Sequence, residues 1–160
     1  MIASRIAGGV IWSYGNATTA PYTEQFYIGG ANSVRAFSAR SIGPGGYPPE
    51  TDRKYTYINH VGDIRIEANI EYRFRMIADL HGAVFLDAGN VWLMRKDENR
   101  PNGEFTLKNF PKQIALGTGF GLRYDLDFLV FRLDLGIGLH DPYDTGKSGY
   151  YNIPKFKDSM

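Results

Sequence analysis

The chain has 160 residues, of which 43% are hydrophobic and 22% charged, with 18 basic and 17 acidic side chains and no cysteine. The absence of cysteine excludes disulfide scaffolds, zinc ribbons and thiol catalysis, and a formal net charge of +1 gives no support for a nucleic-acid groove. No apolar run approaches the roughly 20 residues that a membrane-spanning helix needs. A spanning β-strand would escape this test, because its apolar and polar residues alternate.

The first predicted strand covers residues 2–14, where Ile6 and Val10 lie on one face and Arg5 on the other. A long segment follows, over about residues 15–61, with several Gly and Pro residues. A connection of this length is uncommon in a compact domain unless the loop itself has a function. We therefore expect a functional loop after the first strand.

Residues 63–75 show the most regular alternation in the chain, with apolar side chains on one face and charged or amide side chains on the other. A period of two predicts a strand, because a helix would scatter these residues around its circumference. The apolar face holds Ile64, Ile66, Ala68, Ile70, Tyr72 and Phe74, and the polar face holds Arg65, Glu67, Asn69, Glu71, Arg73 and Arg75.

Three further segments alternate in a similar way. A tight link joins the strand over residues 63–75 to the first of them, and another joins the last two, which is typical of hairpins. The connection over residues 95–112 and the stretch over 141–160 are long and polar. Tight turns at one end of a sheet and long loops at the other are typical of outer-membrane barrels. These three strands are predicted over residues 82–93, 113–125 and 128–140.

The last two predicted strands carry glycine opposite their large aliphatic side chains, from Gly117 to Gly138. A row of glycines facing water would weaken a strand without gain, whereas glycine is useful where another segment packs close to the backbone. We therefore favour a barrel whose aliphatic face contacts lipid and whose glycines and charges face a lumen occupied by an inserted loop. The alternative is a soluble sandwich or lipocalin-like barrel with an aliphatic core.

Closure of such a barrel needs more strands than the five that can be read here. Single-chain bacterial barrels have about eight or more strands and expose no edge to lipid. The N-terminus also lacks the basic region and the apolar block of roughly 7–15 residues that mark a signal peptide. We therefore expect the chain to be part of a longer polypeptide.

Two motifs resemble those of a known family. Val34-Arg35-Ala36-Phe37 approximates a Val-Arg-Gly-Phe loop element, with Ala36 in place of the usual glycine, and residues 82–92 resemble a Phe-x-Asp-x-Gly-x-Val-Trp strand. The hairpin over residues 117–138 is similar to the penultimate strand pair of the same family. These features resemble the outer-membrane assembly and translocation barrels of the BamA and TamA type, also called the bacterial surface antigen family.

The resemblance implies an all-β, antiparallel fold that is part of a 16-stranded transmembrane β-barrel. This chain would supply strands 11 to 15 and the sixth extracellular loop, which folds back into the lumen, whereas the periplasmic repeats and the last strand would lie outside it. In the family the loop arginine meets acidic side chains on the inner wall. By motif, this implies a loop-to-wall clasp formed by Val34, Arg35, Phe37, Glu71, Asp87 and Gly89.

The residues themselves agree with such a clasp. Glu71 and Asp87 both fall on the faces that the alternation assigns to the lumen. A planar guanidinium such as that of Arg35 suits two carboxylates in a confined site, where an unpaired charge would be costly.

The resemblance further implies a barrel in the outer membrane of a Gram-negative-type bacterium that assists insertion, assembly or translocation of other outer-membrane proteins. Its expected partners are the lipid bilayer, unfolded outer-membrane protein clients and accessory periplasmic proteins or lipoproteins, with no nucleic acid. Two alternatives stay open at this point. One is a barrel of the same superfamily that secretes a passenger or anchors an enzyme, and the other is a soluble barrel that binds a small apolar ligand.

The sequence does not predict an enzyme, a metal site or a cofactor. Asp144-Thr145-Gly146 matches the aspartic-protease triplet and Gly146-Lys147-Ser148 the end of a P-loop. The triplet needs a second, facing aspartate, and the P-loop needs an earlier glycine and a strand-to-helix context that are missing. We interpret both motifs as part of a polar loop.

Overall fold

The computed structural model describes residues 1–17, 19–48, 58–77, 79–126 and 128–143. The two motifs at residues 144–148 therefore lie outside the described residues. In the part of the chain that is described, no helix is long and apolar enough to cross a membrane. The elements are β1 (Ile2–Val10), β2 (Ile64–Ile77), β3 (Leu80–Trp92), the 3-10 helix η2 (Phe110–Gln113), β4 (Ala115–Leu126) and β5 (Leu129–His140).

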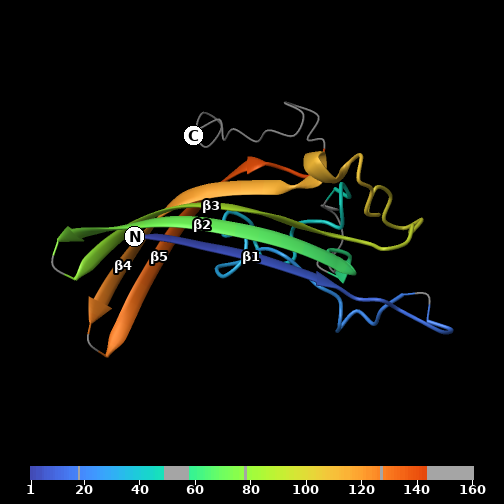
Figure 1. Ribbon diagram of the computed structural model, residues 1–160, viewed down its shortest axis with the longest axis horizontal. Coiled ribbons are helices and arrows are strands. Elements are labelled where there is room, and N and C mark those ends of the chain that lie inside the picture. The colour runs from blue at the N-terminus through green and yellow to red at the C-terminus, as the bar shows by residue number, and fades with distance from the viewer. Residues whose placement is uncertain (18, 49–57, 78, 127, 144–160) are drawn as a thin grey trace, which may run out of the picture.

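All five strands form one antiparallel sheet in which each strand pairs with the next one in the chain (Figure 1). Tight hairpins join β2 to β3, where Ile77 pairs with Leu80, and β4 to β5, where Leu126 pairs with Leu129. The predicted all-β, antiparallel arrangement of five strands is confirmed. The sheet is open, with β1 and β5 at its edges.

The strands differ from their predicted ranges mainly where they meet loops. β1 ends at Val10, four residues before the predicted end. Val10 pairs with Ile64, the first residue of β2, and Gly62 pairs instead with Phe26 of the following loop. The regular β1–β2 pairing therefore stops where β2 begins, with one further backbone hydrogen bond from the N–H of Ile11 to the carbonyl oxygen of Asp63 at 2.7 Å. Relative to prediction, β2 ends two residues later, β3 begins two residues earlier, β4 begins two residues later and β5 begins one residue later.

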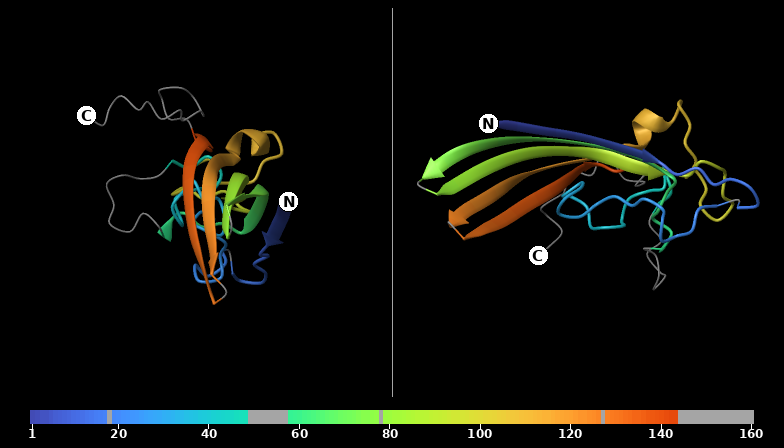
Figure 2. Two further views of the ribbon diagram at one scale, coloured as in Figure 1. Left: turned by 90° about the vertical axis from the view of Figure 1, so that its left-hand side faces the viewer. Right: turned by 60° about the horizontal axis from the view of Figure 1, so that its bottom comes forward.

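The sheet is curved, and the segment that follows β1 folds back against its concave face (Figure 2). We call residues 20–48 of this segment the inner loop and the concave face of the sheet the wall. The opposite, convex face carries large aliphatic side chains that are exposed, such as Ile6 at 84% and Leu135 at 64%. The soluble barrel considered above would bury these side chains in its interior. The structure instead turns them outward, as a lipid-facing surface requires.

The buried core lies between the inner loop and the wall. Because the loop covers the polar side of the sheet, apolar residues of the loop pack on the few apolar positions of the wall and exclude water there. Fully or nearly fully buried residues of this cluster are Ile28, Val34, Ile42, Val91 and Ala115, with Phe26 and Phe37 partly buried beside them.

Candidate functional site

Arg35 of the inner loop forms the centre of the site. Its Nε donates a hydrogen bond to Oδ2 of Asp87 and its Nη2 donates to Oδ1, both at 2.9 Å, while its Nη1 donates to Oε2 of Glu71 at 2.5 Å. The backbone N–H of Arg35 also donates to Oδ2 of Asp87 at 3.1 Å. The planar guanidinium thus binds one carboxylate with two parallel hydrogen bonds and a second carboxylate with its remaining nitrogen. We call this group of three residues the arginine clasp.

The register of β2 and β3 places the two carboxylates of the clasp on the wall. Asp87 lies directly opposite Asn69, so that Glu71, two residues further along β2, projects from the same face of the sheet, diagonal to Asp87. The side chain of Asp87 is fully buried and those of Arg35 and Glu71 are 7% and 8% exposed. Removing one partner from such a set leaves an uncompensated buried charge, at a cost of about 3–5 kcal/mol.

Two further contacts position the guanidinium. Its Cζ lies 3.6 Å from the ring centroid of Phe85 on β3, in the geometry of a cation–π interaction. Its Nη1 also lies 3.9 Å from Oδ2 of Asp134 on β5. Arg35 therefore interacts with side chains of β2, β3 and β5 from a single point of the loop.

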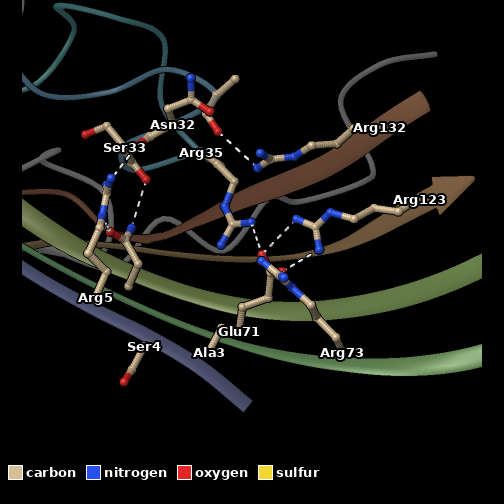
Figure 3. Close-up of a pocket in the computed structure, with 12 residues that line it drawn as sticks. Ala3, Ser4, Arg5, Asn32, Ser33, Arg35, Glu71, Arg73, Arg123 and Arg132 are labelled. Carbon is tan, nitrogen blue, oxygen red and sulfur yellow. Dashed lines mark hydrogen bonds and ion pairs between the residues drawn. The ribbon is translucent and has the colours of Figure 1, made fainter. Parts of the chain in front are cut away.

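Glu71 is shared by several arginines of the wall (Figure 3). Nε of Arg73 donates to its Oε1, and Arg123 donates to both of its oxygens, with Nη2 at 3.1 Å from Oε2. The carboxylate therefore accepts hydrogen bonds from Arg35 and from two arginines of the wall itself.

A second set of contacts is centred on Glu67, whose side chain is fully buried. Its Oε2 accepts from Ser33 of the inner loop at 2.8 Å and from Arg65 at 2.6 Å, and its Oε1 accepts from Arg5 of β1. The sequence reasoning missed Glu67 as a partner of the loop. The alternation over residues 63–75 already placed it on the same face as Glu71, but nothing in that pattern identifies Ser33 as its partner.

Wall side chains also bind the main chain of the inner loop. Arg5 donates to the carbonyl oxygen of Asn32 at 2.7 Å, and Asn69 donates to that of Ser33 at 2.9 Å. On the other side of the loop, Arg132 donates to the carbonyl oxygen of Ala31 at 3.1 Å. Three consecutive peptide groups are thus held by side chains from three different strands.

Glycines of β4 and β5 leave room for the tip of the inner loop. A Cβ added to Gly136 would lie 2.8 Å from Cα of Ala36, and one added to Gly117 would lie 2.5 Å from Cβ of Ala36. A Cβ on Gly138 would lie 3.1 Å from the ring of Phe37. We call Gly117, Gly136 and Gly138 the glycine patch. It accounts for three glycines of the row in the sequence, because the inner loop lies where their side chains would otherwise project, whereas a Cβ on Gly119 or Gly121 would meet Phe85 or Asp134 of the wall itself.

The structure separates the six predicted site residues into the three residues of the clasp, a pair in the core and one glycine that lies elsewhere. Arg35 contacts both Glu71 and Asp87 in the clasp. Val34 is fully buried in the core, with Phe37 packed beside it. Gly89 lies apart from the clasp: a Cβ there would lie 2.9 Å from Cδ1 of Ile28, another residue of the loop.

The chemistry of the site is that of paired charges and hydrogen bonds. Within the described ranges, no group of three or more His, Cys, Asp or Glu side chains could hold a metal ion. What the arrangement does physically is to fix the inner loop on the wall, with buried charges of the loop and of the wall satisfying each other.

Comparisons with known proteins agree with this geometry. The Omp85 superfamily domain matches residues 1–152. The outer membrane protein assembly factor BamA of Nitratidesulfovibrio vulgaris is 27% identical over 162 aligned positions, which cover 100% of this chain and 18% of that protein. BamA of Neisseria meningitidis serogroup B is 29% identical over 89 residues, which cover 52% of this chain and 11% of that protein.

The fold is also similar to a solved structure. The crystal structure of BamA from Haemophilus ducreyi lacking POTRA domains 1–3 superimposes with a TM-score of 0.64 at 19% identity, covering 86% of this chain and 28% of that one. The parts of this chain that align with the two curated relatives thus cover only 11% and 18% of the length of those proteins. It belongs to the Omp85 superfamily, and its five strands form part of an outer-membrane β-barrel of the BamA type.

Proposed function

We propose that this chain is the part of an outer-membrane barrel in which the inner loop is fastened to the wall, and that the barrel assists the insertion or translocation of other outer-membrane proteins. Two relatives named as outer membrane protein assembly factors support this proposal. The observation that carries it is the buried arginine clasp, because it ties one loop to side chains of three strands at a single point.

The mechanism is mechanical and involves no covalent step. A barrel that admits a client must open between two of its strands, so that unpaired backbone groups at the strand edges can pair with an incoming strand of the client. Elsewhere the barrel has to keep its shape while these two strands separate. Arg35 braces β2, β3 and β5 from the lumen side, so we assign this sheet and its docked loop to the rigid part of the barrel.

The partners follow from the same proposal. The convex face of the sheet contacts the lipid bilayer, unfolded outer-membrane proteins are the clients, and accessory periplasmic proteins or lipoproteins bind the parts of the barrel protein that lie outside this chain. The loop end of the sheet faces outward from the cell, and the β2–β3 and β4–β5 hairpins face the periplasm.

Arg35→Ala in the intact parent protein tests the proposal. The substitution leaves Asp87 buried beside Glu71 without the loop guanidinium, so we expect the inner loop to detach and client insertion into liposomes to fall about tenfold. Loop docking is measured with Val34→Cys in a cysteine-free parent, because the fully buried Val34 side chain is protected from a thiol-reactive probe while the loop is docked.

Arg100→Ala is the matched control, since Arg100 pairs with Asp97 in the outer loop, which we define as residues 93–109 between β3 and η2. It should leave both client insertion and the labelling of residue 34 unchanged. If Arg35→Ala exposes residue 34 to the probe while client insertion keeps its wild-type rate, the clasp has no role in insertion and the proposal fails.

A further inference from the structure

A pocket of about 470 Å³ lies between the wall and the inner loop. Five of the residues that line it are arginines, and its one lining carboxylate is that of Glu71 (Figure 3). The arginines come from β1, β2, β4, β5 and the inner loop, so the pocket forms only when the loop is docked. We call it the arginine pocket, and its arginines are Arg5, Arg35, Arg73, Arg123 and Arg132.

Positive charge exceeds negative charge in this pocket. Arg35, Arg73 and Arg123 all donate to the single lining carboxylate of Glu71, and Arg35 also binds Asp87, which does not line the pocket. The remaining two arginines pair with carboxylates that do not line the pocket: Arg5 with Glu67 and Arg132 with Asp134.

The sheet register adds to this imbalance. Arg123 of β4 lies directly opposite Arg132 of β5, and like charges in directly opposed positions destabilise a sheet. The two guanidiniums turn to different carboxylates, Glu71 and Asp134. An anion bound between them would relieve the repulsion that remains.

Guanidinium nitrogens with unused hydrogen-bonding capacity are present in the pocket. Arg73 uses only Nε in a hydrogen bond to a described residue. Arg132 uses Nε and Nη2, which leaves its Nη1 without an acceptor in the described part of the chain. Both side chains are partly exposed, at 42% and 36%. Guanidinium N–H groups that lack an acceptor bind carboxylates through charge-assisted hydrogen bonds.

We propose that the arginine pocket binds an acidic segment of another polypeptide, through Asp or Glu side chains that reach Arg73 and Arg132. The pocket opens on the concave face of the sheet, away from the convex face that contacts lipid, so lipid phosphates do not reach it. A barrel of 16 strands, the size that the family resemblance implies, encloses an aqueous lumen, through which a peptide segment can approach. This inference goes beyond the insertion function, because it names the chemistry of a ligand and holds for any task of the barrel.

The test uses the intact parent protein in a non-ionic detergent and a fluorescein-labelled ten-residue peptide of alternating Asp and Gly. Fluorescence anisotropy should show binding of this peptide that weakens as salt is added, and much weaker binding of the matching Asn–Gly peptide. Arg73→Gln combined with Arg132→Gln should weaken binding at least about tenfold, since each removes charge-assisted hydrogen bonds. Lys108→Gln combined with Lys112→Gln removes the same charge from exposed residues outside the pocket and should leave the affinity unchanged.

A second variant covers the case in which the double substitution prevents folding. Arg132→Gln alone leaves every hydrogen bond to Glu71 in place but removes the bond to the carbonyl oxygen of Ala31. It should still weaken binding of the Asp–Gly peptide several-fold, with circular dichroism as the check of folding and protection of residue 34 in the Val34→Cys background as the check that the loop stays docked. The proposal is overturned if the intact protein does not bind the Asp–Gly peptide, if it binds the Asn–Gly peptide equally well, or if the folded variants bind like the wild type. Displacement of the peptide by an equal concentration of inorganic phosphate would also overturn it, because the site would then select any small anion.

Discussion

Asp87 has no exposed surface and accepts four hydrogen bonds, three from Arg35 and one from Asn69. Each of these hydrogen bonds ends on one of the two carboxylate oxygens, and the two from the guanidinium also depend on the negative charge. The guanidinium that it binds is itself buried, so that neither group can exchange its partner for water. Removal of one charge of the clasp is therefore costly, because it leaves the other charge buried without its partner.

Asp87→Asn keeps the shape of this side chain and removes its charge. We expect the free energy of unfolding of the parent barrel to fall by about 3 kcal/mol, because the buried Arg35 guanidinium loses its bidentate carboxylate and keeps only Glu71 and the more distant Asp134 as charged partners. Denaturant unfolding in detergent micelles measures the change. Asp97→Asn, in a partly exposed ion pair of the outer loop, should cost less than about 1 kcal/mol. Equal losses for the two variants would contradict the special role of Asp87.

The outer loop gives a prediction of pH dependence. Burial tends to raise the pKa of Asp97, but hydrogen bonds from Arg100 and from the amide of Asn99 outweigh burial and lower this pKa below its ordinary value. The ionised form is therefore favoured in the folded loop. Its contribution is present above the ordinary Asp pKa and is lost as the pH falls through the lowered pKa.

We expect amide hydrogen exchange over residues 97–103, corrected for the intrinsic pH dependence of exchange, to accelerate as the pH falls through this range. In Asp97→Asn the corrected exchange should already be fast at neutral pH and should not change further with acidification. An identical acid response in the variant would assign the effect to other carboxylates.

On the scale of elements, the glycine patch and the inner loop depend on one another. The loop approaches the backbone of β4 and β5 so closely that a methyl group on Gly136 would overlap with Ala36. The Val-Arg-Gly-Phe element that this loop resembles has glycine where this chain has Ala36. The methyl group of Ala36 faces Gly117, and the absence of a side chain at Gly117 is what admits it.

Gly136→Ala should therefore displace the loop tip and lower the free energy of unfolding by about 1–3 kcal/mol, as is usual for overpacking. The buried residue 34 should become accessible to a thiol-reactive probe in the Val34→Cys background. Gly8→Ala is the matched control in β1, where a Cβ would meet only the carbonyl oxygen of Arg65 at an ordinary 3.6 Å. Wild-type protection of residue 34 in Gly136→Ala would contradict the close approach.

The alternation of residues predicts the strands and their faces well, because the period of two leaves only one choice once a buried face is known. It placed Glu71 and Asp87 on the wall. The partners of Glu67 could not be predicted in this way, since Ser33 reaches it from a loop 34 residues earlier in the chain. Contacts of this kind depend on the path of a loop without regular secondary structure, and no local periodicity encodes that path.

On the scale of the whole molecule, the two faces of the sheet differ in polarity and in what covers them. Its concave face is polar and covered by the loop, whereas its convex face is aliphatic and exposed. A window average of hydropathy mixes the two faces and resembles that of an ordinary water-soluble domain. The distinction appears only when the faces are considered separately.

Leu135→Arg tests the environment of the convex face. In a bilayer, an arginine near the membrane midplane of a barrel costs about 2–4 kcal/mol, so the yield of folded parent protein in lipid vesicles should fall sharply. Leu107→Arg makes the same change at a residue that is 80% exposed in the segment before η2, outside the strands, and should have little effect. Similar yields for both variants would indicate that Leu135 does not contact lipid.

The bonds from Arg5, Asn69 and Arg132 to three carbonyl oxygens of the inner loop have a consequence for comparing members of the superfamily. Because the wall recognises the main chain at positions 31 and 32, exchange of the side chains there leaves the docking bonds intact. Two barrels can therefore diverge in sequence at these positions and still hold their loops in the same place. Sequence drift at positions 31 and 32 is consequently a poor measure of drift in structure, and the same two positions are suitable for attaching a spectroscopic label to the docked loop.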